Sequence, residues 1–192
     1  MTANLSRLLN ALGLLAIDAV LLLAFADQLW FHELPCPLCI LSRAAFIAAG
    51  FGIALNLVFG PQPSHYGLTL LGASAGAAIS IRQILLHIVP DTGSYGSPVF
   101  GLHLYSWALI IFGLMVVGTG LMLQFDRQFT QVEPVPNKLK IMLVSAFMVF
   151  AALAVGNVIS TLMICGVGLC PKDPAGYLIF NDNLSLTLGE AP

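Results

Sequence analysis

The chain has 192 residues, of which 58% are hydrophobic and 8% are charged, and its mean hydropathy is +0.94. An ordinary soluble domain has about a quarter of its residues charged, so this composition excludes a soluble enzyme and a disordered chain. The formal net charge is −2 and the sequence contains no basic run, which excludes a surface that tracks nucleic-acid phosphates. The composition therefore indicates a protein embedded in a lipid bilayer.

Five apolar stretches are long enough to cross that bilayer. A spanning helix needs about 20 apolar residues, and clusters of proline and glycine, which cannot extend a helix, separate the stretches. The predicted spans are 8–31, 38–59, 67–89, 102–125 and 141–164. The short connections predict that consecutive helices are antiparallel neighbours.

We therefore expect an all-α membrane protein with a single transmembrane domain over residues 1–192. Its parts would be a four-helix core, a connecting loop, an extra fifth helix and a C-terminal tail, at 1–125, 126–140, 141–164 and 165–192. An odd number of spans places the two termini on opposite sides of the membrane.

The basic residues predict the orientation. Arg7, Arg127, Lys138 and Lys140 lie at one face of the membrane, and only Lys172 lies at the other. The positive-inside rule then places the N-terminus and the 126–140 loop in the cytoplasm. The segment 32–37, the loop 90–101 and the tail after residue 164 face outward, and all four cysteines lie on or near that side.

The first stretch has a rival interpretation. Arg7, the apolar run and Ala24-Phe25-Ala26 imitate a secretory signal peptide with its cleavage site. Asp18 is unusual in such an apolar run. We therefore expect 8–31 to be a retained span.

The four cysteines form two close pairs, Cys36/Cys39 and Cys165/Cys170. Outside the cytoplasm thiols stay oxidised, so the pairs would be two structural disulfides, one zinc site or a redox centre. Zinc is disfavoured because closed four-cysteine sites normally belong to small soluble folds. Two residues between cysteines at the start of a helix is the spacing of dithiol oxidoreductases, since a helix N-terminus favours the reactive thiolate.

Arg43 follows Cys39 by four residues, one helical turn deeper on the same face. A charged side chain at that depth needs a partner. It would serve either as an anchor that reaches back to the interface or as a cation that polarises the carbonyl oxygen of a bound electron acceptor. A quinone suits this acceptor role because it is apolar, dissolves in the bilayer and takes two electrons, the number that a dithiol gives.

These residues carry a resemblance to a known family. Trp30, Glu33, the motif Pro35-Cys36-Pro37-Leu38-Cys39 and Arg43 resemble the DsbB family of bacterial inner-membrane proteins, and the stretch from Tyr95 to Trp107 resembles some of its wider members. The resemblance implies a four-helix bundle. It also implies an enzyme of disulfide bond formation that re-oxidises a periplasmic thioredoxin-like protein of the DsbA type and passes the electrons to ubiquinone or menaquinone.

The resemblance also implies roles for single residues. Cys36 and Cys39 match the membrane-proximal redox pair, Cys39 would meet the quinone, and Arg43 matches the arginine near the quinone ring. The family's histidine on the third helix has no clear match: His87 and Gln83 both lie near that position, and His87 is assigned to it. Trp107 would wall the quinone pocket or simply belong to an interfacial aromatic belt with Trp30 and Tyr105.

The sequence departs from the family in one respect. Members keep a second cysteine pair between helices three and four, whereas the loop 90–101 has no cysteine. The fifth span returns the chain to the outward side, where it ends in Cys165 and Cys170. We expect this pair to replace the missing one, with the tail packed over residues 32–39. The alternatives are an inert disulfide, or a partner that reduces Cys36–Cys39 directly.

Other polar and small residues within the spans carry further expectations. Asp27 would pair with Arg43 or Arg82, while Asp18 lies deeper and has no evident partner. His87 and His103 would ligate a haem, hydrogen-bond a quinone oxygen or merely meet solvent. Two sets of glycines predict close helix packing, namely Gly72 with Gly76 on the third span and Gly113, Gly118 and Gly120 on the fourth.

Taken together, the sequence predicts a five-helix dithiol:quinone oxidoreductase with no metal site. A first alternative is a non-catalytic structural or assembly subunit of a larger membrane complex, whose cysteines form structural disulfides. A second alternative is reduction of quinone-like substrates for their own sake, as in vitamin K epoxide reductases, which also use a CxxC pair in a membrane helix.

Overall fold

The computed structural model describes residues 2–30, 34–88, 99–130, 134–166, 170 and 176–177. Five of its helices are long and apolar enough to cross a membrane: α1 (Ala3–Trp30), α2 (Pro37–Phe59), α3 (Pro63–His87), α4 (Leu104–Leu123) and α6 (Asn137–Cys165). The short α5 (Arg127–Thr130) lies between α4 and α6. The predicted all-α membrane fold is confirmed, and α1, α3 and α6 begin a few residues before their predicted starts.

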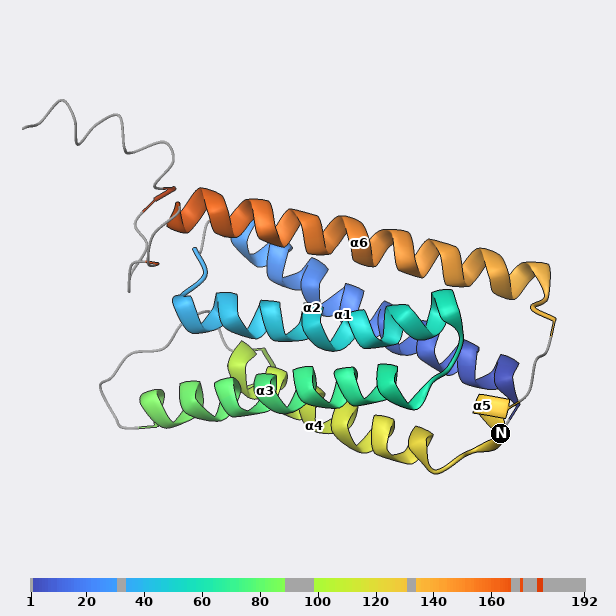
Figure 1. Cartoon of the computed structure of the whole chain (residues 1–192). Helices are drawn as coiled ribbons and strands as arrows, with labels where there is room; N and C mark the ends of the chain where they lie inside the picture. The colour runs from blue at the N-terminus through green and yellow to red at the C-terminus, as the bar shows by residue number, and fades with distance from the viewer. Residues whose placement is uncertain are drawn as a thin grey trace, which may run out of the picture.

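The first four long helices pack in sequence, α1 on α2, α2 on α3 and α3 on α4. Helix α6, the fifth spanning helix, was expected to lie beside α4. It packs instead against α1 and α2 (Figure 1). Between α4 and α6 the chain passes one end of the bundle, where α5 contacts α1. This crossing releases α6 from α4 and brings it alongside α1.

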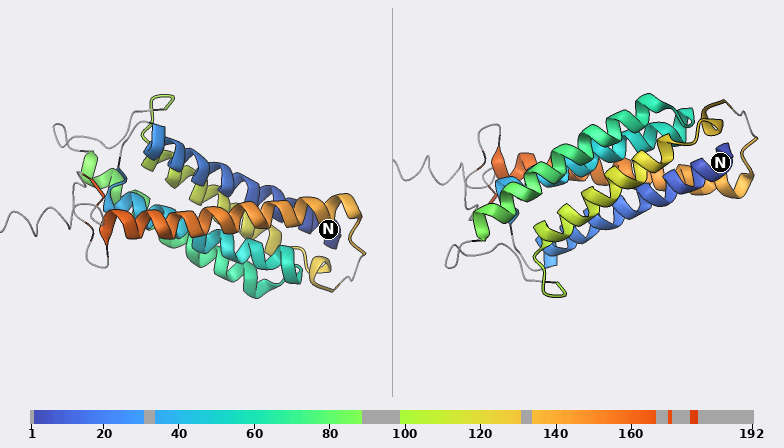
Figure 2. Two further views of the ribbon diagram at one scale, coloured as in Figure 1. Left: turned by 90° about the horizontal axis from the view of Figure 1, so that it is seen from above. Right: turned by 90° about the horizontal axis from the view of Figure 1, so that it is seen from below.

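Helices α1 and α6 run in the same direction, as two contacts near their ends show. Asn4 Nδ2 donates to the Pro134 carbonyl at 3.1 Å, and Gln28 Nε2 donates to Ser160 Oγ at 2.9 Å. The end of the bundle where α1, α3 and α6 finish and where α2 and α4 begin is called the cysteine end below (Figure 2). The other end, where α1 begins, is called the opposite end.

Apolar side chains from all five long helices fill the interior. Leu14 and Leu21 of α1, Phe46 of α2, Phe112 of α4 and Phe150 of α6 are buried in one cluster. The rings of Phe46 and Phe112 stack with their centroids 4.0 Å apart. Many other large apolar side chains stay exposed, as expected of helices that face lipid, including Leu22, Leu23, Leu71, Leu114, Val117, Ile141 and Met148.

The close helix packing predicted for the third span is confirmed. A Cβ atom on Gly72 would lie 2.5 Å from the backbone nitrogen of Ala49 on α2, and one on Gly76 would collide with the Phe112 ring. The same expectation for α4 is wrong, because a Cβ on Gly113 or Gly118 would meet nothing within 4 Å. The same holds for Gly120, so the glycines of α4 do not bring helices of this chain together.

A buried polar cluster fastens the opposite end. Tyr66 Oη accepts from Asn10 Nδ2 at 2.7 Å and donates to Gln128 Oε1 at 3.1 Å, while Ser6 Oγ donates to the same Gln128 oxygen at 2.6 Å. Asn56 Nδ2 donates to Asn10 Oδ1 at 3.0 Å. Side chains of α1, α2, α3 and α5 thus satisfy one another, which compensates their removal from water.

Replacing Gly72 with alanine tests the α2–α3 contact. The added methyl group would press on backbone atoms of Ala49, which cannot move aside as a flexible side chain can, so we expect Gly72→Ala to lower the free energy of unfolding by about 1–3 kcal/mol. Denaturant unfolding in detergent measures the change. Gly113→Ala is the matched control, with an expected effect between zero and about 1 kcal/mol of stabilisation. Equal stabilities for the two variants would contradict the packing argument.

Candidate functional site

The first cysteine pair lies at the N-terminus of α2 and forms a disulfide, with its Cα atoms 5.0 Å apart. Cys36 is the residue that caps the helix, and its Sγ accepts the backbone N–H of Cys39 at 3.1 Å. Pro37 follows at the first helical position, where its missing N–H costs nothing. The sulfur of Cys36 therefore lies where unpaired amides and the helix dipole stabilise negative charge.

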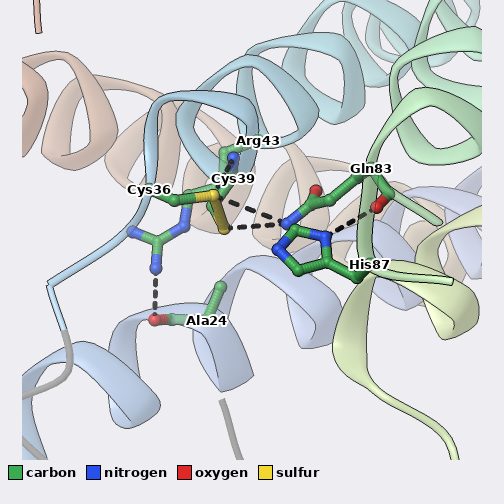
Figure 3. Close-up of a disulfide and its surroundings, with 6 residues drawn as sticks. All are labelled: Ala24, Cys36, Cys39, Arg43, Gln83 and His87. Atoms are coloured by element: carbon green, nitrogen blue, oxygen red, sulfur yellow. Dashed lines mark hydrogen bonds between the residues drawn. A yellow bond between two sulfur atoms is a disulfide. The ribbon is translucent and has the colours of Figure 1, made fainter. Parts of the chain in front are cut away.

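A third residue reaches both sulfurs from α3. Gln83 Nε2 lies 3.4 Å from Cys39 Sγ and 3.5 Å from Cys36 Sγ, and the side chain is buried (Figure 3). Its neighbour one turn on, His87, points its Nδ1 at the Gln83 carbonyl at 2.7 Å. Gln83, rather than His87, is thus the residue of the third helix that contacts the disulfide.

A cavity of about 440 Å³ opens beside the disulfide. Residues from four helices line it, together with the segment that precedes α2: Val20, Leu21, Leu23, Ala24, Asp27, Leu34, Pro35, Cys36, Cys39, Ser42, Arg43, Phe46, Gln83, Leu104, Tyr105, Ala108 and Ile111. Most of these side chains are apolar, and among the few polar ones the Gln83 amide contacts the sulfurs. This is the composition of a small-molecule site, in which apolar walls bind and a few polar groups orient.

Arg43 lines the cavity and is held by α1. Its Nη1 donates to Gln28 Oε1 at 2.8 Å, and its Nη2 donates to the Ala24 carbonyl at 2.7 Å. The guanidinium also lies 5.8 Å from the centroid of the Phe25 ring. Two nitrogens are thereby fixed by hydrogen bonds, so the cation has a set position one turn below Cys39.

Of the predicted pairs of Asp27, the one with Arg43 is present only as an electrostatic interaction, and the one with Arg82 is absent from the described residues. In the part of the chain that the structure describes, the Asp27 carboxylate forms no direct salt bridge with Arg43, but it lines the same cavity and acts on the Arg43 charge. Gln28 occupies the position that faces α2, and a neutral amide satisfies the guanidinium without burying a second charge. Arg82 is exposed, and Asp18 is buried with both carboxylate oxygens lacking a hydrogen-bond partner.

Two residues expected near an acceptor are not among those that line the cavity. Trp107 does not line the cavity, because its indole N–H donates to the Val99 carbonyl at 3.0 Å. Tyr105 lines the cavity instead, since two positions along a helix turn a side chain to another face. His87 is also absent from the cavity wall; its ring stacks on Tyr105 at 5.5 Å, and that of His103 does so at 5.3 Å.

The second cysteine pair, Cys165 and Cys170, is a disulfide at the end of α6 and therefore lies at the cysteine end as well. Most of the tail lies outside the described residues, and so do His32 and Glu33. The prediction that the tail packs over 32–39 therefore lies mostly outside the described part of the chain. One described tail residue does reach the site, because Gln28 Nε2 lies 3.4 Å from Tyr177 Oη. Gln28 thus joins the tail, α6 and Arg43.

Comparison with known proteins identifies the family of this chain. The family model for disulfide bond formation protein DsbB matches residues 6–94. Disulfide bond formation protein B of Xanthomonas euvesicatoria is 33% identical over 116 residues, which cover 57% of this chain and 67% of the relative. The protein of the same name from Nitrosomonas eutropha is 34% identical over 110 residues, covering 53% of this chain and 68% of the relative. The chain belongs to the DsbB family.

The matched DsbB region contains α1 to α3 and thus the first cysteine pair, Arg43 and Gln83. The fifth spanning helix and the second cysteine pair lie after it. No solved structure matches this chain.

Sequence reasoning missed Gln28 and left Gln83 without a role. Both are amides in otherwise apolar helices, and a polar side chain within a span is expensive unless it is paired. That rule drew attention to Asp27 and Arg82, whose charges are more conspicuous. The distinguishing signal was position: Gln28 and Gln83 lie on the inward faces of α1 and α3, and both are buried.

Removing the shared amide should weaken the cysteine end. Gln28→Leu leaves the half-buried Arg43 donor without its side-chain partner, and an unsatisfied donor removed from water costs about 1–3 kcal/mol or more when charged. We expect that loss in the free energy of unfolding in detergent. Ser160→Ala, which removes one neutral partner of the same amide, should cost less than Gln28→Leu. A Gln28→Leu variant as stable as the parent would show that Arg43 does not depend on this bond.

Proposed function

We propose that this chain is a dithiol:quinone oxidoreductase of disulfide bond formation. In the proposed reaction, electrons pass from a reduced thioredoxin-like protein of the DsbA type through the cysteine pairs to membrane quinone. The observation that carries the proposal is that the Cys36–Cys39 disulfide lines a largely apolar cavity that Arg43 also lines. The names of the relatives, each a disulfide bond formation protein B, support the same conclusion.

The cavity fits a quinone headgroup in size and chemistry. Its volume of about 440 Å³ lies in the range of small-molecule sites, and its walls are suited to an apolar ring. Arg43 would donate to a ring oxygen, and Phe46 and Tyr105 would contact the ring. When bound, a quinone supplies the acceptor for two electrons and two protons.

The protein's own contribution begins with the disulfide. An incoming thiolate attacks one sulfur of Cys36–Cys39, a mixed disulfide forms, and the electron pair of the broken bond stays on the other sulfur as a thiolate. A second exchange releases the oxidised donor and leaves Cys36 and Cys39 as a dithiol. The dithiol then gives up two electrons and two protons and becomes a disulfide again, with Cys39 proposed as the sulfur nearest the acceptor.

For the second pair, we propose a relay. The partner's thiolate would attack Cys165–Cys170 first, and the resulting dithiol would then reduce Cys36–Cys39. Both pairs lie at the cysteine end, and the tail that follows Cys170 reaches Gln28 through Tyr177. These positions support the relay over a remote structural disulfide.

The proposed setting is the bacterial inner membrane, with the N-terminus in the cytoplasm and the C-terminal tail in the periplasm. Arg7, Arg127, Lys138 and Lys140 gather at the opposite end, and the positive-inside rule places that end in the cytoplasm. The cysteine end then faces the compartment in which disulfides persist.

The decisive experiment is quinone-dependent oxidation of a reduced thioredoxin-fold protein by the full chain in detergent. We expect turnover in the parent and only the uncatalysed background in Cys36→Ser and Cys39→Ser, because neither variant can form the disulfide that accepts electrons. Absorbance of the quinone and free thiols of the substrate are followed together. Gly113→Ala, at a position that touches nothing, should retain full turnover. Equal rates in the parent and in Cys39→Ser would refute the proposal.

The relay has a separate test in a Cys165→Ala/Cys170→Ala double variant. We expect oxidation of the thioredoxin-fold protein to fall to background, while a small dithiol such as dithiothreitol is still oxidised, because it reaches Cys36–Cys39 without a relay. Both substrates are assayed with the same quinone. Unchanged turnover of the protein substrate would mean that the second pair is structural, or that the partner reduces Cys36–Cys39 directly.

A further inference from the structure

Gln83 contacts both sulfurs of the first pair but has no role in the scheme above. Its side chain is 2% exposed, lines the cavity and places Nε2 at 3.4 Å from Cys39 Sγ and 3.5 Å from Cys36 Sγ (Figure 3). A primary amide carries two N–H groups. One buried amide can therefore serve both sulfurs.

The two sulfurs differ in their other donors. Cys36 Sγ also accepts the backbone N–H of Cys39, at 3.1 Å. For Cys39 Sγ, Gln83 is the hydrogen-bond donor found within the described part of the chain. Arg43 donates instead to Gln28 and to the Ala24 carbonyl. Negative charge on Cys39 therefore depends on Gln83 more than negative charge on Cys36 does.

A hydrogen bond from Gln83 gains strength as the disulfide opens. A neutral disulfide sulfur is a weak acceptor, whereas a thiolate forms a charge-assisted bond. An interaction that is stronger in the transition state than in the ground state accelerates the step, and a donor already in place costs no reorganisation. Burial of the Gln83 side chain increases the effect, because water competes poorly for its N–H groups.

We propose that Gln83 is a catalytic residue that stabilises the leaving thiolate of the Cys36–Cys39 pair, with its main effect at Cys39. When a thiolate attacks Cys36 Sγ, a new S–S bond forms, the Cys36–Cys39 bond breaks, and its electron pair goes to Cys39 Sγ beside Gln83 Nε2. An amide neither takes up nor releases a proton in this step, so its donation persists at any working pH. The proposal rests on the redox role proposed above for this pair.

The test uses the reduced full chain in detergent, with iodoacetamide as the probe and mass spectrometry to follow each cysteine separately. In Gln83→Met, which replaces the amide with an apolar chain of similar length, we expect alkylation of Cys39 at pH 7 to slow about tenfold, the scale of one hydrogen bond to a charged group. The alkylation of Cys36 should slow by a smaller factor. At about pH 11, where the thiol is ionised in both proteins, the rates should converge, which separates thiolate stabilisation from access.

A second readout uses the oxidised protein. Opening of Cys36–Cys39 by dithiothreitol should slow in Gln83→Met by a similar factor. Ser80→Ala is the matched control, because Ser80 is buried one turn earlier on α3 and its hydroxyl has no hydrogen-bond partner; both rates should equal those of the parent. Gln83→Asn, which withdraws the amide by one methylene, should also slow the alkylation of Cys39. This variant replaces Gln83→Met in the test if Gln83→Met does not fold.

Unchanged alkylation and opening rates in folded Gln83→Met or Gln83→Asn would overturn the inference, as would equal slowing of Cys36 and Cys39. Neither readout involves quinone or a protein partner. Failure of the parent to oxidise a thioredoxin-fold protein would refute the proposed function, while these rates would still decide whether Gln83 stabilises the Cys39 thiolate.

Discussion

The hydrogen bond between Arg43 and Gln28 is the interaction on which the cysteine end depends. A guanidinium within a membrane bundle must be satisfied by the protein, and here one amide oxygen and the Ala24 carbonyl do so. Meeting this requirement fixes α2 on α1 at the depth of the first cysteine pair. The same amide bonds Ser160 and Tyr177, so α6 and the tail are positioned by the residue that positions the cation.

This arrangement divides the electrostatic tasks at the cavity among three groups. The amide of Cys39 and the start of α2 act on Cys36, Gln83 acts on both sulfurs, and Arg43 is held one turn deeper, where its charge faces the cavity. None of these donors comes from a loop. Groups on packed helices keep their geometry through a reaction, which is the condition for electrostatic stabilisation to lower a barrier.

Much of the fold was predictable because hydropathy reports directly on membrane spans, and proline marks where α2 and α3 begin. The cysteine motif with Arg43 identified the centre of the site, since spacing along one helix fixes which side chains share a face. Contacts between helices were less accessible. Gln28 rather than Asp27 is the hydrogen-bond partner of Arg43 because of how α1 is rotated about its axis. In the same way, the rotation of α4 about its axis decides that Tyr105 rather than Trp107 lines the cavity. Periodicity in nearly uniformly apolar helices does not specify that rotation.

The position of the second cysteine pair follows from the direction of α6. A helix that follows α4 must begin at the opposite end, so it ends at the cysteine end whatever neighbours it chooses. Packing beside α1 fixes the position of this end of α6 more closely. Ser160, five residues before Cys165, bonds the same Gln28 amide that bonds Arg43. The added membrane crossing thus brings the Cys165–Cys170 disulfide to the same end of the bundle as Cys36–Cys39. The amide of Gln28 links α6, which carries Cys165, to Arg43 beside the cavity.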